Sequence, residues 1–268
     1  MDQTSQPLVR FEKRRDLGIM TLDNPSENRI SRAVYADLGR AARQAARSDC
    51  RALLIRADGA DFSWGGDFME WPLLTTNIAK RERFGFSNGI LQMIETLPFP
   101  TIAAVHGRAF GGGFELALHA DLIIASKSAR FRFSEATLGV SPLAGGIQRI
   151  AERAGRAVAV RLVMLSEEMS ADEAARLNVV AKIVPDDKLE EEALALAGKL
   201  ANGPTRAHAV SKLVLSAWST SGVRAADEVM ISAVCDLLAT RDAEAGVASA
   251  IEARKAARPR PEIDFSGA

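Results

Sequence analysis

Cysteine and histidine are scarce in this sequence, which has two cysteines and three histidines among 268 residues. Cys50 and Cys235 lie far apart in helix-like contexts and lack the spacing of metal ligands. His106, His119 and His208 are likewise not paired with cysteine or acidic residues in a metal-binding pattern. We therefore expect no metal site, and free cysteines in a reducing, intracellular setting.

The sequence also lacks an excess of charge and a long apolar run. Thirty-four basic residues balance thirty-four acidic ones, so no overall field favours nucleic acid or an anionic membrane. The stretch 1–15 carries Asp2, Arg10 and Glu12 among few apolar residues, which excludes the apolar core of a signal peptide. No apolar run approaches the roughly 18 residues of a membrane-spanning helix. The sequence predicts a cytoplasmic protein without nucleic-acid or membrane partners.

What the sequence does have is an ordinary globular composition with alternating strand and helix patterns. Its 268 residues, 47% of them hydrophobic, suffice for one large domain or a domain with an appendage. A hairpin is predicted within 9–22, with its turn at 16–18, and Ser31 is the candidate N-cap of a helix that ends near Ser48. Further strands are predicted at 51–57, 101–106, 122–125, 131–133 and 179–184, and further helices up to about 96 and at 147–154, 158–165, 171–177, 189–201, 205–219, 223–238 and 241–258. The alternation indicates an α/β core followed by a helical last third.

The most informative motif is the glycine-rich run 107–118, which contains Gly111, Gly112 and Gly113 at a predicted strand-to-helix junction. Without Cβ atoms, the backbone N–H groups there can approach an anion or a developing oxyanion. A second glycine pair, in the segment 63–67, could supply a partner N–H, and two such donors form an oxyanion hole. The run is neither a phosphate-binding Walker loop nor a good dinucleotide fingerprint. These features point to chemistry on a carbonyl group.

Two glutamates are the candidate acid–base residues. Glu115 follows the glycines on the first turn of the predicted helix, and Glu135 ends a predicted strand. If the fold brings them to one water molecule, their pKa values would separate, so that one acts as acid and the other as base. Simpler interpretations remain open at this point: Glu115 could complement a helix dipole and Glu135 could be an ordinary loop carboxylate. Ser63 and Ser134 lack the nucleophile-elbow pattern of serine hydrolases.

Five segments together resemble the crotonase (enoyl-CoA hydratase/isomerase) superfamily. They are Asn24-Pro25 with 28–31, the segment 62–67, the block 102–121, the segment 133–146 with Gln148-Arg149, and the segment 248–255. The resemblance implies an α/β fold, a crotonase-like spiral of ββα units, followed by a C-terminal helical trimerisation region. It divides the chain into a core with the active site, 1–200, and the helical region, 201–268. It also implies a homotrimer or a dimer of trimers, that is, a homohexamer.

The resemblance further implies an acyl-CoA thioester as the substrate, so that coenzyme A is part of the substrate and no separate cofactor is needed. The two thioester-binding N–H groups would come from Gly66 and Gly112. The two hydratase carboxylates fall on Glu115, which would deprotonate the water, and Glu135, which would give a proton to C2. Isomerases of the family typically keep only one of these acids. The predicted substrate-binding residues around them are Arg29, Trp64, Gly65, Asp67 and Gly111.

Several positions depart from the family pattern. Arg29 replaces a small residue, Trp64 adds bulk beside an oxyanion donor, Ser134 stands where proline is common, and Ala250 stands where phenylalanine often covers the ligand of a neighbouring subunit. The stretch 68–84, which would border the acyl pocket, is mixed and loop-like. The alternatives to a hydratase are therefore an isomerase, a hydrolase that cleaves a diketone C–C bond with one of the two histidines near the glycine run, or a non-catalytic scaffold.

Overall fold

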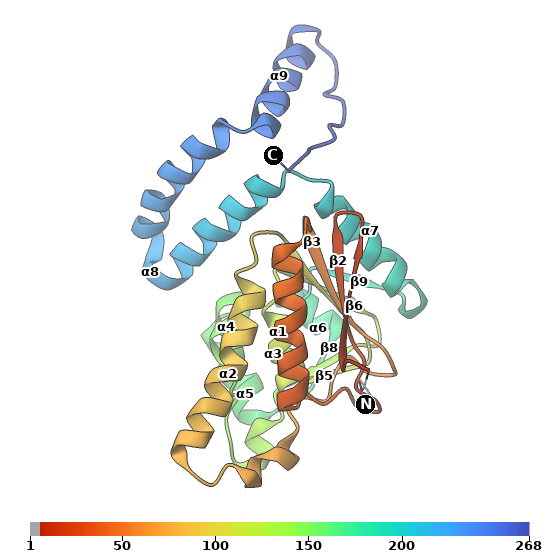
Figure 1. The fold of residues 1–268 in the computed structure, drawn as a ribbon, viewed down its shortest axis with the longest axis vertical. Helices are drawn as coiled ribbons and strands as arrows, with labels where there is room; N and C mark the ends of the chain where they lie inside the picture. The colour runs from red at the N-terminus through yellow and green to blue at the C-terminus, as the bar shows by residue number, and fades with distance from the viewer. Residues whose placement is uncertain (1–5, 268) are drawn as a thin grey trace, which may run out of the picture.

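The computed structural model describes residues 6–267 and confirms the α/β architecture (Figure 1). Its main sheet has the order β1-β2-β3-β4-β6-β9, in which β1 and β2 are antiparallel and the later neighbours are parallel. The strands are β1 (Val9–Arg14), β2 (Leu17–Leu22), β3 (Ala52–Ala57), β4 (Thr101–Val105), β6 (Leu122–Ser126) and β9 (Lys182–Val184). The order of the sheet therefore follows the order of the chain.

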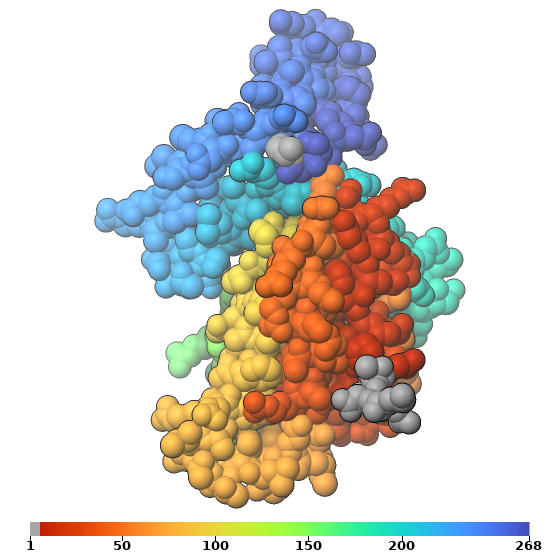
Figure 2. Space-filling view, viewed as in Figure 1, coloured from red at the N-terminus to blue at the C-terminus, as the bar shows by residue number. Residues whose placement is uncertain are grey.

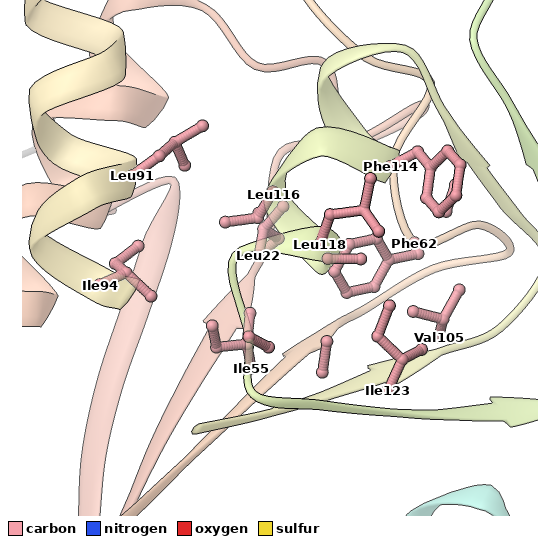
Figure 3. Packing of buried hydrophobic residues seen from close by; sticks show 14 of the residues in the cluster. Leu22, Ile55, Phe62, Leu91, Ile94, Val105, Phe114, Leu116, Leu118 and Ile123 are labelled. Carbon is pink, nitrogen blue, oxygen red and sulfur yellow. The ribbon is translucent and has the colours of Figure 1, made fainter. Parts of the chain in front are cut away.

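Helices cover both faces of this sheet, which explains why β2 is buried at every position. Leu17 and Ile19 pack in the layer beneath α7, whereas Met20 and Leu22 belong to the larger core on the opposite face. Figure 3 shows that larger core, where side chains of α2 and α3 meet those of the strands. The covering helices are α1 (Arg32–Arg47), α2 (Asn77–Glu95), α3 (Gly112–Leu118) and α7 (Leu189–Ala201).

A second, three-stranded sheet carries the glycine-rich run. β4 continues through Gly107, whose φ is +53°, into β5 (Arg108–Phe110), which pairs with β7 (Arg130–Arg132), and β7 pairs in turn with β8 (Met169–Ser170). β5 and β8 were not predicted, because runs of two or three residues show no periodicity. The hairpin turn was predicted at 16–18, but both Leu17 and Gly18 lie in β2 and the turn is at Arg15-Asp16.

The remaining short elements surround the second sheet. The stretch 68–84 was predicted to be loop-like, but it contains a 3₁₀ helix and the first turns of α2. The side chains of Asp67 and Thr76 cap the N-termini of these two helices. These two N-caps are the sequence signals for the helix starts. The short elements are η1 (Phe68–Leu73), η2 (Glu135–Leu138), α4 (Gly146–Ala154), α5 (Arg156–Leu165), α6 (Ala171–Arg176) and η3 (Asp186–Lys188).

The C-terminal helices α8 (Thr205–Leu238) and α9 (Arg241–Lys255) form an arm that projects from the core (Figures 1 and 2). Gly222, with φ +82°, interrupts α8 and separates the two helices predicted there. Lys212 fastens the arm to the core by donating to Asp121 Oδ2 at 2.7 Å and to the Phe99 carbonyl oxygen at 3.1 Å. The division of the chain into 1–200 and 201–268 stays a prediction.

The arm exposes many large apolar side chains. Those on α8 and α9 are Leu213, Leu215, Trp218, Val223, Met230, Ile231, Val234, Leu238, Val247 and Ile251. Exposed apolar side chains are common singly, but a concentration of them on one projecting element is typical of a surface that another chain covers.

Candidate active site

A cavity of about 270 Å³ lies where α1, α2, α3, η1 and η2 meet. Seven of the predicted site residues line it: Arg29, Trp64, Gly66, Gly111, Gly112, Glu115 and Glu135. Gly65 and Asp67 are not among the lining residues, and both have structural roles. Gly65 adopts φ +95° and accepts a backbone hydrogen bond from Ile30, while the Asp67 carboxylate accepts one from the Met69 N–H.

Two backbone N–H groups converge on the cavity. A Cβ atom built on Gly112 would lie 3.3 Å from the backbone nitrogen of Gly66, so the two peptide segments are adjacent. Among the described residues, neither the Gly66 nor the Gly112 N–H has a hydrogen-bond acceptor. The Gly112 N–H is also a free donor at the start of α3. This is the arrangement of an oxyanion hole.

The loop that carries Gly66 is held rigidly against the glycine run. The buried hydroxyl of Ser63 donates to the Asn28 carbonyl oxygen at 2.7 Å and accepts from the Gly65 N–H at 3.1 Å. The Asn28 side chain donates to two carbonyl oxygens of the same loop, those of Asp58 and Asp61. These bonds give Asn28 and Ser63 a structural role beside the glycines, which sequence reasoning did not predict.

Glu115 is anchored through one of its two carboxylate oxygens. Oε1 accepts hydrogen bonds from the backbone N–H groups of Ala144 at 2.8 Å and Gly146 at 2.9 Å. The residue is only 2% exposed. Burial raises the pKa of Glu115, and the N–H groups of Gly146 and Ala144 oppose that rise. The anchored oxygen fixes the side chain, so that the second oxygen can act on a ligand.

Glu135 begins η2 and lines the same cavity. It is 7% exposed, and its Oε2 is buried without a hydrogen-bond partner in the described part of the chain. Burial first, and the charge of Glu115 second, raise the pKa of Glu135 to about 7. Gly111 has φ +48°, a left-handed backbone conformation that favours glycine, and a Cβ built on it would lie 2.8 Å from Glu135 Oε1. The fold thus brings together the two carboxylates that are 20 residues apart in the sequence.

Arg29 and Trp64 border the cavity with large side chains. Arg29 pairs with Glu27 at 2.6 Å and places its guanidinium carbon 4.9 Å from the centre of the Phe68 ring. The Trp64 indole donates to Asp61 Oδ2 at 2.8 Å, and the guanidinium carbon of Arg108 lies 4.8 Å from the centre of its ring. Glu27 and Asp61, neither of which lines the cavity, thus hold these two bulky side chains in place.

The histidines are not part of the lining of the cavity. His119 is buried, its Nδ1 lies 2.8 Å from the Glu115 carbonyl oxygen, and burial lowers its pKa to about 4. His106 contacts the carbonyl oxygen of Gly59 instead. Within residues 6–267, no group of three or more His, Cys, Asp or Glu side chains could hold a metal ion.

Sequence reasoning missed three buried polar residues that line the cavity: Tyr35 on α1, and Arg83 and Ser87 on α2. Each lies on the buried face of its helix, where apolar residues are usual. A polar residue at an apolar helical position is the signal that could have indicated them, but it identifies no site without the partner helix.

The fold and the cavity define an α/β protein with two converging backbone donors and two buried carboxylates. A family model described as enoyl-CoA hydratase/isomerase matches residues 12–258, and the chain belongs to this family. It is 35% identical over 207 residues to a probable enoyl-CoA hydratase of Rhodobacter capsulatus, covering 76% of this chain and 79% of the relative. A carnitinyl-CoA dehydratase of Salmonella heidelberg is 37% identical over 75% of this chain and 77% of its own length.

Solved structures support the same assignment of the fold. The enoyl-CoA hydratase subunit I of Geobacillus kaustophilus superposes with a TM-score of 0.87 at 30% identity, over 97% of this chain and 98% of that one. The crotonase fold expected from the sequence is thereby confirmed. In the described part of the chain, no helix combines the length and the apolar character needed to cross a membrane.

Proposed function

We propose that the protein adds water across the C2=C3 double bond of an enoyl-CoA thioester. The observation that carries the proposal is the joint presence, in one cavity, of two free backbone N–H groups and two buried glutamates that differ in their bonding. An isomerase needs one acid–base carboxylate, so the second glutamate favours hydration. The names of the relatives, which include hydratases and a dehydratase, support the same chemistry in its two directions.

In this mechanism the N–H groups of Gly66 and Gly112 bind the thioester oxygen, on which negative charge builds as water adds. The free oxygen of Glu115 takes a proton from the water, and the water oxygen bonds to C3. Glu135, protonated near neutral pH because of its raised pKa, gives its proton to C2. The thioester is restored, the double bond has become a single bond, and one proton must pass from Glu115 back to Glu135 before the next turnover.

The test is hydration of crotonyl-CoA and of longer and aryl enoyl-CoA thioesters, followed by loss of absorbance of the conjugated thioester. We expect Glu115→Gln and Glu135→Gln each to lower kcat by about 10² to 10⁴, the usual contribution of one acid–base group. Both variants keep the shape of the side chain, and circular dichroism should confirm that they are folded. Absence of turnover by the wild-type protein on every thioester that it binds would refute the hydratase proposal.

The other candidates have less support. Cleavage of a diketone with His106 or His119 lacks a histidine in the cavity lining. A scaffold role would leave the buried, unpaired oxygen of Glu135 without a purpose, because an unpaired buried polar group costs free energy. We therefore retain the enzymatic proposal, with coenzyme A entering as part of the substrate and with no separate cofactor.

We also propose that the protein assembles as a homotrimer or a dimer of trimers through the arm. The apolar side chains that α8 and α9 expose support this assembly, because burying them between subunits would be favourable at about 25 cal/mol per Å². The formal net charge is zero, so copies of the chain do not repel one another strongly.

A further inference from the structure

One wall of the cavity is polar in a way that hydration itself does not use. Tyr35 and Ser87 line it together with Arg83, which is only 4% exposed. The Arg83 guanidinium donates to the Ser87 hydroxyl and to Glu70 Oε2, the latter at 3.0 Å, and the Ser87 hydroxyl donates to the Arg83 carbonyl oxygen at 3.0 Å. Its Nε is buried without an acceptor in the described residues. We call Tyr35, Arg83 and Ser87 the polar wall.

The polar wall lies close to the reacting groups. A Cβ built on Gly112 would be 3.8 Å from the Tyr35 hydroxyl oxygen, and the charges of Glu115 and Glu135 both act on that hydroxyl. Burial is the main cause that raises the pKa of Tyr35 far above its usual value; Arg83 and hydrogen bonding by Ser87 oppose it only in part. The phenol is therefore neutral and can donate a hydrogen bond at any physiological pH.

An unsubstituted alkyl chain would bury the polar wall without offering it any acceptor. Unpaired buried donors cost about 1–3 kcal/mol each, and sites built to hydrogen-bond a substrate oxygen discriminate strongly against analogues that lack it. Part of the neighbouring wall is aromatic, with Trp71 and Phe84 in edge contact at 6.3 Å between ring centres. The other polar side chains of the lining, apart from the two glutamates, are half-buried or exposed, whereas those of the polar wall are buried.

We propose that the polar wall is a specificity subsite for an acyl group that carries a neutral oxygen, a hydroxyl or a ketone, within a few carbons of the thioester. The inference rests on the proposed function only in taking an acyl-CoA as the ligand of this cavity. A neutral oxygen fits better than a carboxylate, because Glu70 already balances the charge of Arg83. A second anion would also face Glu115, whose burial already disfavours negative charge.

Binding of unreactive saturated thioesters tests the subsite without requiring turnover. Isothermal titration with 4-oxopentanoyl-CoA and 4-methylpentanoyl-CoA compares a ketone oxygen with a methyl group on chains of equal size. We expect the wild-type protein to bind the ketone about three to ten times more tightly, the effect of one net hydrogen bond. Glutaryl-CoA and 5-oxohexanoyl-CoA form a second pair, in which we expect the ketone to bind more tightly than the carboxylate.

Tyr35→Phe removes the phenol donor and should lower the ratio of the two affinities to nearly one. Ile78→Ala, at the exposed start of α2, is the matched control that should keep the ratio. A wild-type preference for 4-methylpentanoyl-CoA, or a ratio unchanged in Tyr35→Phe, would overturn the subsite and assign the polar wall a structural role. Selective binding without hydration of any enoyl-CoA would refute the hydratase proposal alone. Failure to bind any acyl-CoA would refute both proposals.

Discussion

Glu115 and Glu135 share one cavity, yet their surroundings give them different properties. Glu115 has one oxygen bonded to two backbone N–H groups, whereas Glu135 has a buried oxygen without a partner in the described chain. Hydrogen bonds stabilise a carboxylate and their absence destabilises it. The proposed roles follow from this difference. Glu115, the carboxylate with two backbone donors, acts as the base, and Glu135, with its unpaired oxygen, keeps its proton.

The first prediction concerns the pH dependence of the rate. If Glu135 must be protonated to give its proton to C2, kcat/KM should fall as pH rises through about 7, the raised pKa of Glu135. The fall should approach tenfold per pH unit above the pKa. The measurement is a pH profile of hydration between pH 5.5 and 9 at constant ionic strength. A profile that stays flat up to pH 9 would contradict the assignment of Glu135 as the acid.

The second prediction concerns stability. The folded protein binds the Glu135 proton up to about pH 7, but the unfolded chain loses it near 4.5, so stability falls as pH rises between these two values. At pH 8, Glu135→Gln should therefore raise the free energy of unfolding by up to about 3 kcal/mol.

Glu115→Leu should lower the free energy of unfolding, because two backbone donors lose their acceptor. Urea titrations at pH 5 and pH 8 check both signs, and a loss of stability in Glu135→Gln at pH 8 would be inconsistent with this account.

At the scale of elements, the junction of β5 and α3 depends on the absence of side chains. A Cβ on Gly113 would lie 2.6 Å from the Ser63 Cβ and 2.7 Å from the Ser63 carbonyl oxygen. We predict that Gly113→Ala destabilises the protein by about 1–3 kcal/mol. It should also lower kcat/KM at least tenfold, since the loop with Gly66 must move and small displacements of reacting groups are costly.

A matched control lies in α2. A Cβ on Gly89 would have no neighbour within 4 Å among the described residues, so Gly89→Ala should stabilise the protein by about 0.5–1 kcal/mol through helix propensity. Thermal unfolding and hydration assays on both variants distinguish the effects. Equal stability of the two variants would show that the close approach at Gly113 is not needed.

The elements also show what a sequence can predict. The hairpin, β4, α3 and the break at Gly222 were predictable, since each has a local signal: alternation, an apolar run or a glycine at a junction. β5 and β8 were not, because pairing with distant strands rather than local periodicity creates them. The glycines and glutamates of the site have local sequence signals and could be named. Their proximity in space, and the polar wall contributed by α1 and α2, depend on how the elements pack.

At the scale of the whole molecule, the proposed assembly depends on the arm. Ile231 on α8 is 65% exposed in the single chain. The proposed interface would bury this side chain, and a lysine at the same position would place a charge there. We predict that Ile231→Lys shifts the assembly to smaller species, measured by size-exclusion chromatography with light scattering. Ile78→Lys, at a residue that is 71% exposed on α2, makes the same change outside the arm and should leave the assembly intact. A wild-type monomer would contradict the proposal.

The strand order of the main sheet has a consequence for how the chain is made. Because β1, β2, β3, β4, β6 and β9 lie side by side in the order in which they are translated, the sheet can grow as the chain leaves the ribosome. β9 ends at Val184 in a chain of 268 residues, so 84 residues follow the last strand, and their synthesis takes roughly 4 to 17 s. Both glutamates and both donor glycines precede that interval, and what remains to be made is η3, α7 and the arm. The chain can therefore place its pocket residues before it gains the apolar arm.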